Sequence, residues 1–362
     1  MSTPSRPQHT STRQRGIPRR AALAAVAASV LGASATLATV AQAEPPQRSA
    51  AGQPESASAG AARHGSAFTA LPGAEVFPES IAIDHATGVY YVGSVKDGTI
   101  FRGQVGSDTV SVFSKSGADG RTIANGLALD GNRLIVLSRQ TGKVYAYDTR
   151  NGAHLATLDN GLGATGTFLN DISVTQDGTA YLTDSVNPWL YRMTRTASGG
   201  YRLEKFLDFT GTPLHYISAP GAAGINVNGI TATPDGRHLI VAKRNENALY
   251  RITLADRSVE KVQLPAGALE TPDGIFLRGR TLYAAQNTPR SVAVLHFSAD
   301  YRSATAGTPL TDPSFRFPTS AAVHGNRLLV VNAQFDSKGS PAAVSGPNPP
   351  VLPFGVTTLR LH

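Results

Sequence analysis

The sequence predicts an all-β fold, a six-bladed β-propeller with four antiparallel strands per blade, and three observations lead to this prediction. A polar residue ahead of an apolar run recurs at Glu79, Asn125, Asn170, Asn228, Asp273 and Thr319. The steps between these positions are 46, 45, 58, 45 and 46 residues, and a period near 45 is typical of repeat architectures. Each period also holds four short runs rich in Val, Ile, Tyr and Thr, separated by turn residues, which indicates an antiparallel meander. A single four-stranded unit cannot bury both of its faces, so six such units are expected to close into a ring.

Residues 1–43 are predicted to be an export signal that precedes this fold. They carry five arginines and no acidic residue, then an apolar run to about residue 40, and Ala41-Gln42-Ala43 offers the small residues that a signal peptidase reads. The Arg19-Arg20 pair resembles a twin-arginine signal, with general secretion as the alternative. We therefore expect a secreted, extracytoplasmic protein, cleaved after about Ala43 and without a membrane span once the signal is removed.

Residues 44–65 are predicted to be a flexible linker, because a segment so rich in Pro, Gly, Ser and Ala has little apolar bulk to offset the entropy of ordering. Residues 66–362 then form the propeller. The chain carries 33 Lys and Arg against 25 Asp and Glu, but the signal holds five of the arginines and none of the acids. The remaining excess of about three positive charges does not favour a nucleic-acid partner. The absence of cysteine excludes thiol catalysis and cysteine-based metal sites.

The predicted strands can be placed within the repeats. In the first two repeats they cover residues 80–84, 89–94, 99–104, 110–114, 126–130, 134–138, 143–148 and 154–158. In the fifth repeat they cover residues 274–277, 281–285 and 291–297, followed by a weaker fourth run. The sixth repeat supplies only three, over residues 321–324, 327–331 and 356–361. Residues 67–71, ahead of the first repeat, are therefore predicted to complete the last blade.

This topology predicts that one end of the central channel carries the functional residues. The starts of the six first strands lie there, together with the loops that follow the second strands and carry Lys96, Arg139, Asp184, Lys243, Asn287 and Gln334. Two long irregular segments, residues 209–226 and 335–353, fall at the same end, and such segments in compact folds often shape binding pockets. Arg139 and Lys243 could bind an anionic substrate there, or they could pair with neighbouring acids.

Carboxylate and amide oxygens gather at this predicted end of the channel, and they come from Glu79, Asp273, Asn170 and Asn228. Such a set without His or Cys favours a hard divalent cation, Ca²⁺ first, with Mg²⁺ or Mn²⁺ as alternatives. Asn-Gly and Asp-Gly are also ordinary turn dipeptides, but the turns between the first two strands of the repeats fall elsewhere. The residues expected to contact a substrate are Phe168, Asn125, Asp171, Asp184, Trp189 and His215. For Trp189 the alternative is packing beneath the rim, and for His215 it is a solvated loop position.

Four motifs resemble those of the regucalcin, gluconolactonase and luciferin-regenerating-enzyme family of six-bladed propellers, and more distantly the paraoxonases. They are Pro78-Glu79-Ser80, Phe168-Leu169-Asn170-Asp171, Asn228-Gly229-Ile230 and Pro272-Asp273-Gly274. The resemblance covers about residues 66–362. It implies that Glu79, Asn228 and Asp273 hold a catalytic divalent metal, with Asn170 as a ligand or substrate contact. Family lactonases often carry an arginine where this chain has Phe168, which implies a more apolar lactone or ester than a sugar lactone.

The predicted function is metal-dependent hydrolysis of a small lactone or ester, a carboxylic ester hydrolase activity. Asp273 would activate the attacking water, or attack directly, while the cation polarises the carbonyl group. The alternative is a non-catalytic propeller that binds a ligand or protein partner and holds a structural cation, because the fold does not fix the function.

Overall fold

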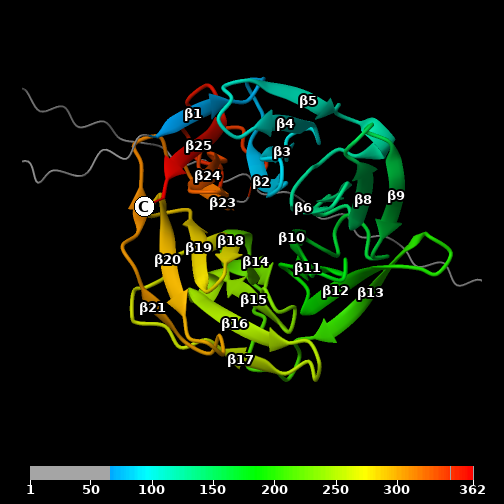
Figure 1. The fold of residues 1–362 in the computed structure, drawn as a ribbon, viewed down its shortest axis with the longest axis vertical. Coiled ribbons are helices and arrows are strands. Elements are labelled where there is room, and N and C mark those ends of the chain that lie inside the picture. The colour runs from blue at the N-terminus through cyan, green and yellow to red at the C-terminus, as the bar shows by residue number, and fades with distance from the viewer. Residues whose placement is uncertain (1–65, 343, 362) are drawn as a thin grey trace, which may run out of the picture. The chain divides into compact units, whose positions relative to one another are not determined.

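The structure is a computed structural model that describes residues 66–342 and 344–361. Figure 1 shows that these residues form six antiparallel sheets around a central channel, which confirms the predicted six-bladed propeller. The predicted export signal and linker, residues 1–65, lie outside the described residues. Within the described ranges, no helix has both the length and the apolar character to cross a membrane.

Each blade is a meander that runs outward from the channel. Blade one contains β2 (Pro78–Ile83), β3 (Val89–Ser94), β4 (Ile100–Gln104) and β5 (Val110–Ser114). Blade two contains β6 (Leu127–Asp130), β7 (Arg133–Leu137), β8 (Lys143–Asp148) and β9 (His154–Asp159). Blade three contains β10 (Leu169–Val174), β11 (Ala180–Asp184), β12 (Trp189–Arg195) and β13 (Tyr201–Asp208).

The other three blades repeat this plan. Blade four contains β14 (Val227–Ala232), β15 (His238–Lys243), β16 (Ala248–Thr253) and β17 (Val259–Lys261). Blade five contains β18 (Pro272–Arg278), β19 (Thr281–Gln286), β20 (Ser291–Phe297) and β21 (Ala304–Ala306), and the two-residue β22 (Leu310–Thr311) also pairs with β20. Blade six contains β23 (Pro318–His324), β24 (Arg327–Asn332), β25 (Gly355–Arg360) and β1 (Ala67–Ala70). The helices of the described residues are three short 3₁₀ turns, η1 (Ala118–Gly120), η2 (Gly221–Gly224) and η3 (Arg244–Glu246).

The N-terminal strand closes the ring, as the sequence predicts. β1 pairs antiparallel with β25, so that Phe68 lies opposite Thr357 and Ala70 opposite Gly355. In Figure 1 the blue β1 lies beside the red β25 at the edge of blade six. The predicted weak fourth strand of blade five is also confirmed, because β21 spans only three residues.

The apolar core fills the spaces between the faces of neighbouring blades. Between blades three and four, the rings of Tyr181 and Phe206 meet at 5.2 Å and pack with Ile230. Between blades six and one, the ring centroids of Phe77 and Phe354 lie 4.8 Å apart. Burying a side chain of this size contributes about 1.5 to 3 kcal/mol relative to leaving it exposed. The interface that closes the ring is thus built like the others.

Glycine lets the inner strands of neighbouring blades approach closely. A Cβ atom on Gly126 would lie 2.5 Å from the main-chain oxygen of Asn170, and one on Gly229 would lie 2.3 Å from that of Asp273. No side chain fits at such distances without movement of the backbone. The Asn-Gly dipeptides at residues 125–126 and 228–229 therefore serve strand packing rather than turns.

Candidate metal and substrate site

β-Bulges at the starts of the inner strands place the polar residues that recur with the repeat. Strand pairing shifts register between Pro78 and Ile81, and equivalent shifts occur in blades three to six. These shifts enclose Glu79, Asn170, Asn228, Asp273 and Thr319. A bulge releases a residue from the strand ladder and redirects its side chain. The same local irregularity therefore recurs at the mouth of the channel in five blades of the described chain.

A cavity of about 260 Å³ lies at this mouth. Its oxygen-bearing side chains include Glu79, Asn170, Asn228 and Asp273, which are the four predicted metal ligands. Its apolar lining includes Phe168, Val186, Ile225, Phe317, Phe335 and Val344. The two long segments predicted at the rim both contribute lining residues, such as Ile225 from residues 209–226 and Val344 from residues 335–353. The structure thus brings the predicted ligands, Phe168 and both rim segments to one cavity.

Of the two amides predicted to be ligands, Asn170 is positioned by hydrogen bonds and Asn228 has an unpaired oxygen. The Nδ2 of Asn170 donates to the Oγ of Ser185 at 2.7 Å, which fixes the orientation of that amide. Its Oδ1 accepts one bond of 3.1 Å from Asn125, whose Nδ2 also donates to the main-chain oxygen of Asn170. The Oδ1 of Asn228 is buried and has no hydrogen-bond partner. Because an unpaired buried oxygen is costly, this atom indicates a missing electrophilic partner.

The two carboxylates are buried where ionisation is unfavourable. Burial raises the pKa of Glu79 well above its usual range, and the negative charges of Asp273 and Asp171 add to this effect, whereas Arg139 opposes it. Burial also raises the pKa of Asp273, but Arg244 and the amides of Asn287 and Asn228 oppose that rise. A cation between the two acids would relieve the cost of holding both ionised.

These donors fit a hard divalent cation. Across the described part of the chain, no three His, Cys, Asp or Glu side chains converge closely enough to hold a metal ion. A bound cation would thus need the amide oxygens of Asn170 and Asn228 beside the two carboxylates. An all-oxygen set of this kind suits Ca²⁺, with Mg²⁺ or Mn²⁺ as alternatives.

A hydrogen-bonded chain leads from Asp273 to Arg244. The Nδ2 of Asn287 donates to the Oδ2 of Asp273 at 2.8 Å, and the Oδ1 of Asn287 accepts from the Nη2 of Arg244 at 3.2 Å. Arg244 also donates to the main-chain oxygen of Ala222. This arrangement occupies one oxygen of Asp273, leaves the other for a cation or water, and directs a positive charge towards the carboxylate.

Arg139, predicted at this end of the channel either to bind an anionic substrate or to pair with acids, lines the cavity. Only 5% of its surface is exposed, and its guanidinium carbon lies 4.5 Å from the ring centroid of Phe168 and 5.8 Å from that of Phe335. Its backbone adopts a left-handed φ of 42° two residues after the end of β7. Its buried Nε has no hydrogen-bond partner. The position that the family resemblance gives to arginine holds Phe168, and an arginine from the neighbouring blade stacks on that ring.

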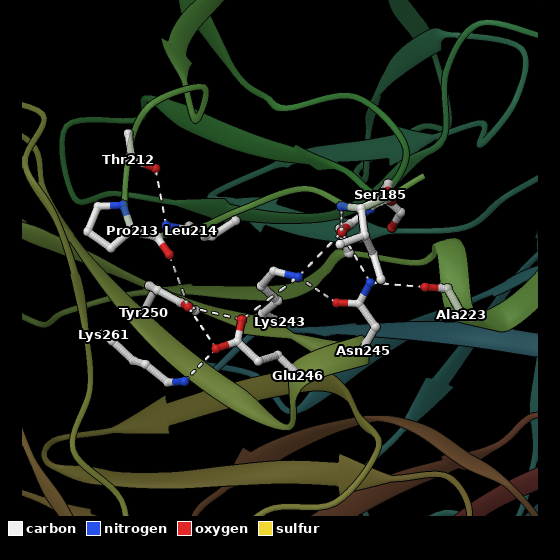
Figure 2. A network of polar contacts seen from close by, with 12 residues as sticks. Ser185, Thr212, Pro213, Leu214, Ala223, Lys243, Asn245, Glu246, Tyr250 and Lys261 are labelled. Atoms are coloured by element: carbon white, nitrogen blue, oxygen red, sulfur yellow. Dashed lines mark hydrogen bonds and ion pairs between the residues drawn. The ribbon is translucent and has the colours of Figure 1, made fainter. Parts of the chain in front are cut away.

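A polar network centred on Lys243 holds one rim segment in place, as Figure 2 shows. The buried Nζ of Lys243 donates to the Oδ1 of Asn245 at 2.6 Å and to that of Asn226 at 3.4 Å. Asn226 in turn donates to three main-chain oxygens, those of Ser185, Ile217 and Gly224. Glu246 accepts from Tyr250 and Lys261 in the same network. Lys243 is therefore engaged in supporting the loop and does not line the cavity.

Five predicted substrate contacts lie outside the cavity lining. The carboxylate of Asp184 accepts hydrogen bonds from Thr167, Phe168, Val186 and Asn187, so it braces a turn. Trp189 begins the third strand of its blade, with the Nζ of Lys205 3.9 Å from its ring centroid. His215 is exposed, Asn125 supports Asn170, and Asp171 lines the channel beneath the mouth. Sequence reasoning placed all five at the correct end, but which side chains reach the cavity depends on contacts between blades.

The chain is similar in structure to several solved propellers. Regucalcin from Agrobacterium tumefaciens, described as a calcium-binding protein, shares 16% identity over 81% of this chain and 92% of its own, with a TM-score of 0.57. A luciferin-regenerating enzyme shares 11% identity over 82% and 98%, with a TM-score of 0.57. A gluconolactonase from Xanthomonas campestris shares 16% identity over 79% and 86%, with a TM-score of 0.52.

No protein-family model matches the sequence, and no curated protein does. At these identities the likeness concerns the fold, and function has to be argued from the site itself. The resemblance predicted from four short motifs is confirmed at that level: this chain has the six-bladed propeller fold of regucalcin, luciferin-regenerating enzyme and gluconolactonase.

Proposed function

We propose that this protein is a divalent-metal-dependent hydrolase of lactones or esters. The observation that carries the proposal is a single cavity that combines two buried carboxylates, an unpartnered amide oxygen on Asn228 and an apolar wall. The likeness to a gluconolactonase of the same fold supports this class of reaction. We also propose, from residues 1–43 alone, that the protein acts outside the cytoplasm.

Glu79, Asn170, Asn228 and Asp273 would hold the cation, with Ca²⁺ as the proposed ion. When bound, it would supply Lewis-acid polarisation of the scissile carbonyl group. Asp273 is the proposed base, because Asn287 fixes its Oδ2 while Arg244 and Asn228 favour its ionised form. Burial and two neighbouring acids raise the pKa of Glu79 well above its usual range, and Arg139 opposes this rise, so Glu79 is proposed as a ligand only.

The proposed reaction is a balanced hydrolysis. The oxygen of a water molecule bonds to the carbonyl carbon while Asp273 takes one of the water protons. The acyl carbon–oxygen bond then breaks, and the departing oxygen takes that proton from Asp273. The products are a carboxylic acid and an alcohol, which are one molecule when the substrate is a lactone.

The cavity wall supports a substrate with an apolar part. Phe168 lines the cavity from blade three, and Phe317 and Phe335 line it from the two ends of the inner strand pair of blade six. Val186 and Val344 add to the same apolar wall. Apolar walls with a few polar groups are typical of small-molecule sites, where the polar groups fix orientation. Aliphatic lactones and short-chain esters are therefore the proposed substrates.

The test is turnover of a lactone and ester panel by the purified protein with Ca²⁺, with EDTA, and after replacement of Ca²⁺ by Mg²⁺ or Mn²⁺. Asp273→Asn is expected to lower kcat by at least about a hundredfold, because a general base typically contributes 10² to 10⁴ in rate. Asp108→Asn, an exposed acid in the β4–β5 turn, is the matched control and should change nothing. Stabilisation by Ca²⁺ without turnover of any lactone or ester would instead identify a binding module with a structural cation.

A further inference from the structure

Arg139 is a buried charge that lies near the two carboxylates but forms no hydrogen bond with them. Its side chain lies among Glu79 and Asp273, the aromatic rings of Phe168 and Phe335, and the open cavity. No hydrogen bond from its guanidinium to a described residue is formed, and its Nε is enclosed without a partner. Burying a charged group without a partner is expensive, so such a group indicates a ligand.

The charges of the cavity also point to an anion. Two carboxylates, Glu79 and Asp273, face two guanidinium groups, Arg139 and Arg244, so the cavity is close to neutral by itself. With a divalent cation on the carboxylates, the same cavity would carry a net positive charge. A negatively charged ligand would reduce this excess of positive charge in a partly desolvated space, where charge interactions are stronger than in water.

Arg139 and Arg244 differ in how free they are. Arg244 is tied to Asn287 by two nitrogen atoms and to the main-chain oxygen of Ala222 by a third. On one side, the guanidinium group of Arg139 contacts the face of the Phe168 ring. Stacking of this kind orients a guanidinium group and leaves its N–H groups available for hydrogen bonds. Arg139 is therefore the donor that can accept a new partner.

We propose that Arg139, stacked on Phe168, forms a carboxylate-binding subsite, and that the natural ligand carries a free carboxylate next to an apolar chain. The planar guanidinium matches a carboxylate with two parallel hydrogen bonds. The apolar chain would contact Phe168, Phe335 and the rim. One part of this inference rests on the proposed function, namely that the ligand is the substrate. That substrate would then carry a free carboxylate in addition to the ester or lactone group that is cleaved.

Direct binding tests the subsite without any need for turnover. Isothermal titration of the Ca²⁺-loaded protein with hexanoate and with neutral hexanamide is expected to show at least about tenfold tighter binding of hexanoate. Arg139→Met should remove that preference, and Arg139→Lys should keep part of it, because the charge remains but the two-pronged geometry is lost. Phe168→Ala should weaken hexanoate binding as well.

The controls separate this subsite from other causes. Arg237→Gln, in the exposed β14–β15 turn at the opposite end of the blade, should leave both affinities unchanged. The melting temperature of Ca²⁺-loaded Arg139→Met without hexanoate should be close to that of the Ca²⁺-loaded wild type, because the bound cation balances Glu79 and Asp273 when the guanidinium group is removed. If Arg139→Met binds hexanoate as tightly as the wild type, the carboxylate is held elsewhere, for example by the cation, and the inference is overturned.

Kinetics then show whether the carboxylate belongs to the substrate. The expected result is a higher kcat/KM for monomethyl adipate, which has one ester and one free carboxylate, than for neutral methyl hexanoate. In Arg139→Met the ratio of the two values should fall to about one. A ratio near one in the wild type overturns the assignment to the substrate. If hexanoate binding depends on Arg139 but no ester or lactone is hydrolysed, the subsite is supported and the proposed hydrolase function is contradicted.

Discussion

Single carboxyl groups in and just beneath the mouth of the channel are buried where ionisation is unfavourable. Burial and neighbouring acids hold the pKa of Glu79 well above its usual range, and burial raises the pKa of Asp171 to about 7. The folded protein therefore binds protons at these positions that the unfolded chain releases. A cation that replaces those protons would convert an unfavourable arrangement into a stable one.

The pH dependence of stability should report on Asp171. Its pKa is raised in the folded state, so its contribution to stability is full below about pH 4 and is lost as the pH rises through about 7. In EDTA, the free energy of unfolding of the wild type relative to Asp171→Asn should thus fall by about 2 to 3 kcal/mol between pH 5 and pH 8. Urea unfolding at both pH values measures this, and a difference that grows with pH would contradict it.

Asn228 should matter for the cation and little for the fold. Its Oδ1 is unpaired in the structure, so Asn228→Ala is expected to weaken Ca²⁺ binding at least about tenfold while changing the unfolding free energy in EDTA by less than about 1 kcal/mol. Asn125→Ala is the matched comparison, because it removes two hydrogen bonds to Asn170 and should destabilise by about 1 to 2 kcal/mol. Calorimetric Ca²⁺ titration and urea unfolding distinguish the two patterns. Equal loss of stability in both variants would show that Asn228 is a packing residue.

At the level of strands, the recurrent bulge and the close contact between neighbouring inner strands occur at adjacent residues. The bulge turns a polar side chain towards the mouth of the channel, and a small residue next to it lets the neighbouring strand approach. Ser80 and Asp171 hold the equivalent place in blades one and three, and each bonds to the next blade. The Oγ of Ser80 accepts from the main-chain nitrogen of Leu127, and the Oδ2 of Asp171 accepts from that of Ile230. Site geometry and blade spacing are therefore set by the same few residues.

Gly229→Ala tests this connection. Its Cβ would lie 2.3 Å from the main-chain oxygen of Asp273 and 2.8 Å from the nitrogen of Ile275, so β14 and β18 must separate. We expect a loss of more than about 3 kcal/mol in unfolding free energy, together with weaker Ca²⁺ binding. Gly200→Ala, in the turn between β12 and β13, meets only an ordinary contact at 3.4 Å and should cost less than about 1 kcal/mol. Similar stability of the two variants would rule out the tight approach.

The sequence was sufficient for the elements but not for every side chain at the site. Period and turn residues predict the blades, the closing strand and the shared cavity of Glu79, Asn170, Asn228 and Asp273, because these follow from local patterns repeated at a fixed interval. For Arg139 the sequence predicts the end of the channel and two alternative roles, anion binding or pairing with acids, but not its stacking on Phe168. Its approach to Phe168 depends on a left-handed residue after β7 and on the packing of blade two against blade three, which no local pattern encodes. Asp184 does not line the cavity, because its carboxylate accepts hydrogen bonds from the main-chain nitrogens of Phe168 and Val186.

At the level of the whole ring, blade six joins the two ends of the propeller. Three of its strands come from the C-terminal part of the chain, and β1 supplies the fourth. Thr319 adds a polar link, because its Oγ1 donates to the main-chain oxygen of Glu79 in blade one at 2.7 Å. The ring is thus fastened between blades six and one by backbone pairing, apolar packing and a hydrogen bond at the mouth of the channel.

Leu71→Ala should loosen this closure. Leu71 is 2% exposed, packs in the core that joins blades six and one, and donates its main-chain nitrogen to Phe354 at 2.8 Å. Removing most of its side chain is expected to lower the unfolding free energy by about 2 to 4 kcal/mol and to speed proteolysis of the N-terminal strand. Ala67→Ser, an exposed change on the same strand, is the control. Unchanged protease resistance in Leu71→Ala would show that closure does not depend on this anchor.

The pairing of β1 with β25 also has a consequence for biosynthesis. Ala67 pairs with Thr358, so the two partners are separated in the sequence by almost the whole propeller. A ribosome completes five blades before it has made β25, so the nascent chain must carry β1 without its partner strand until the last residues emerge. Contacts of such long range form slowly and leave a strand edge free to pair with other chains in the meantime. Translation speed and chaperone supply should therefore affect the yield of this protein more strongly than they affect proteins whose terminal strands pair with near neighbours.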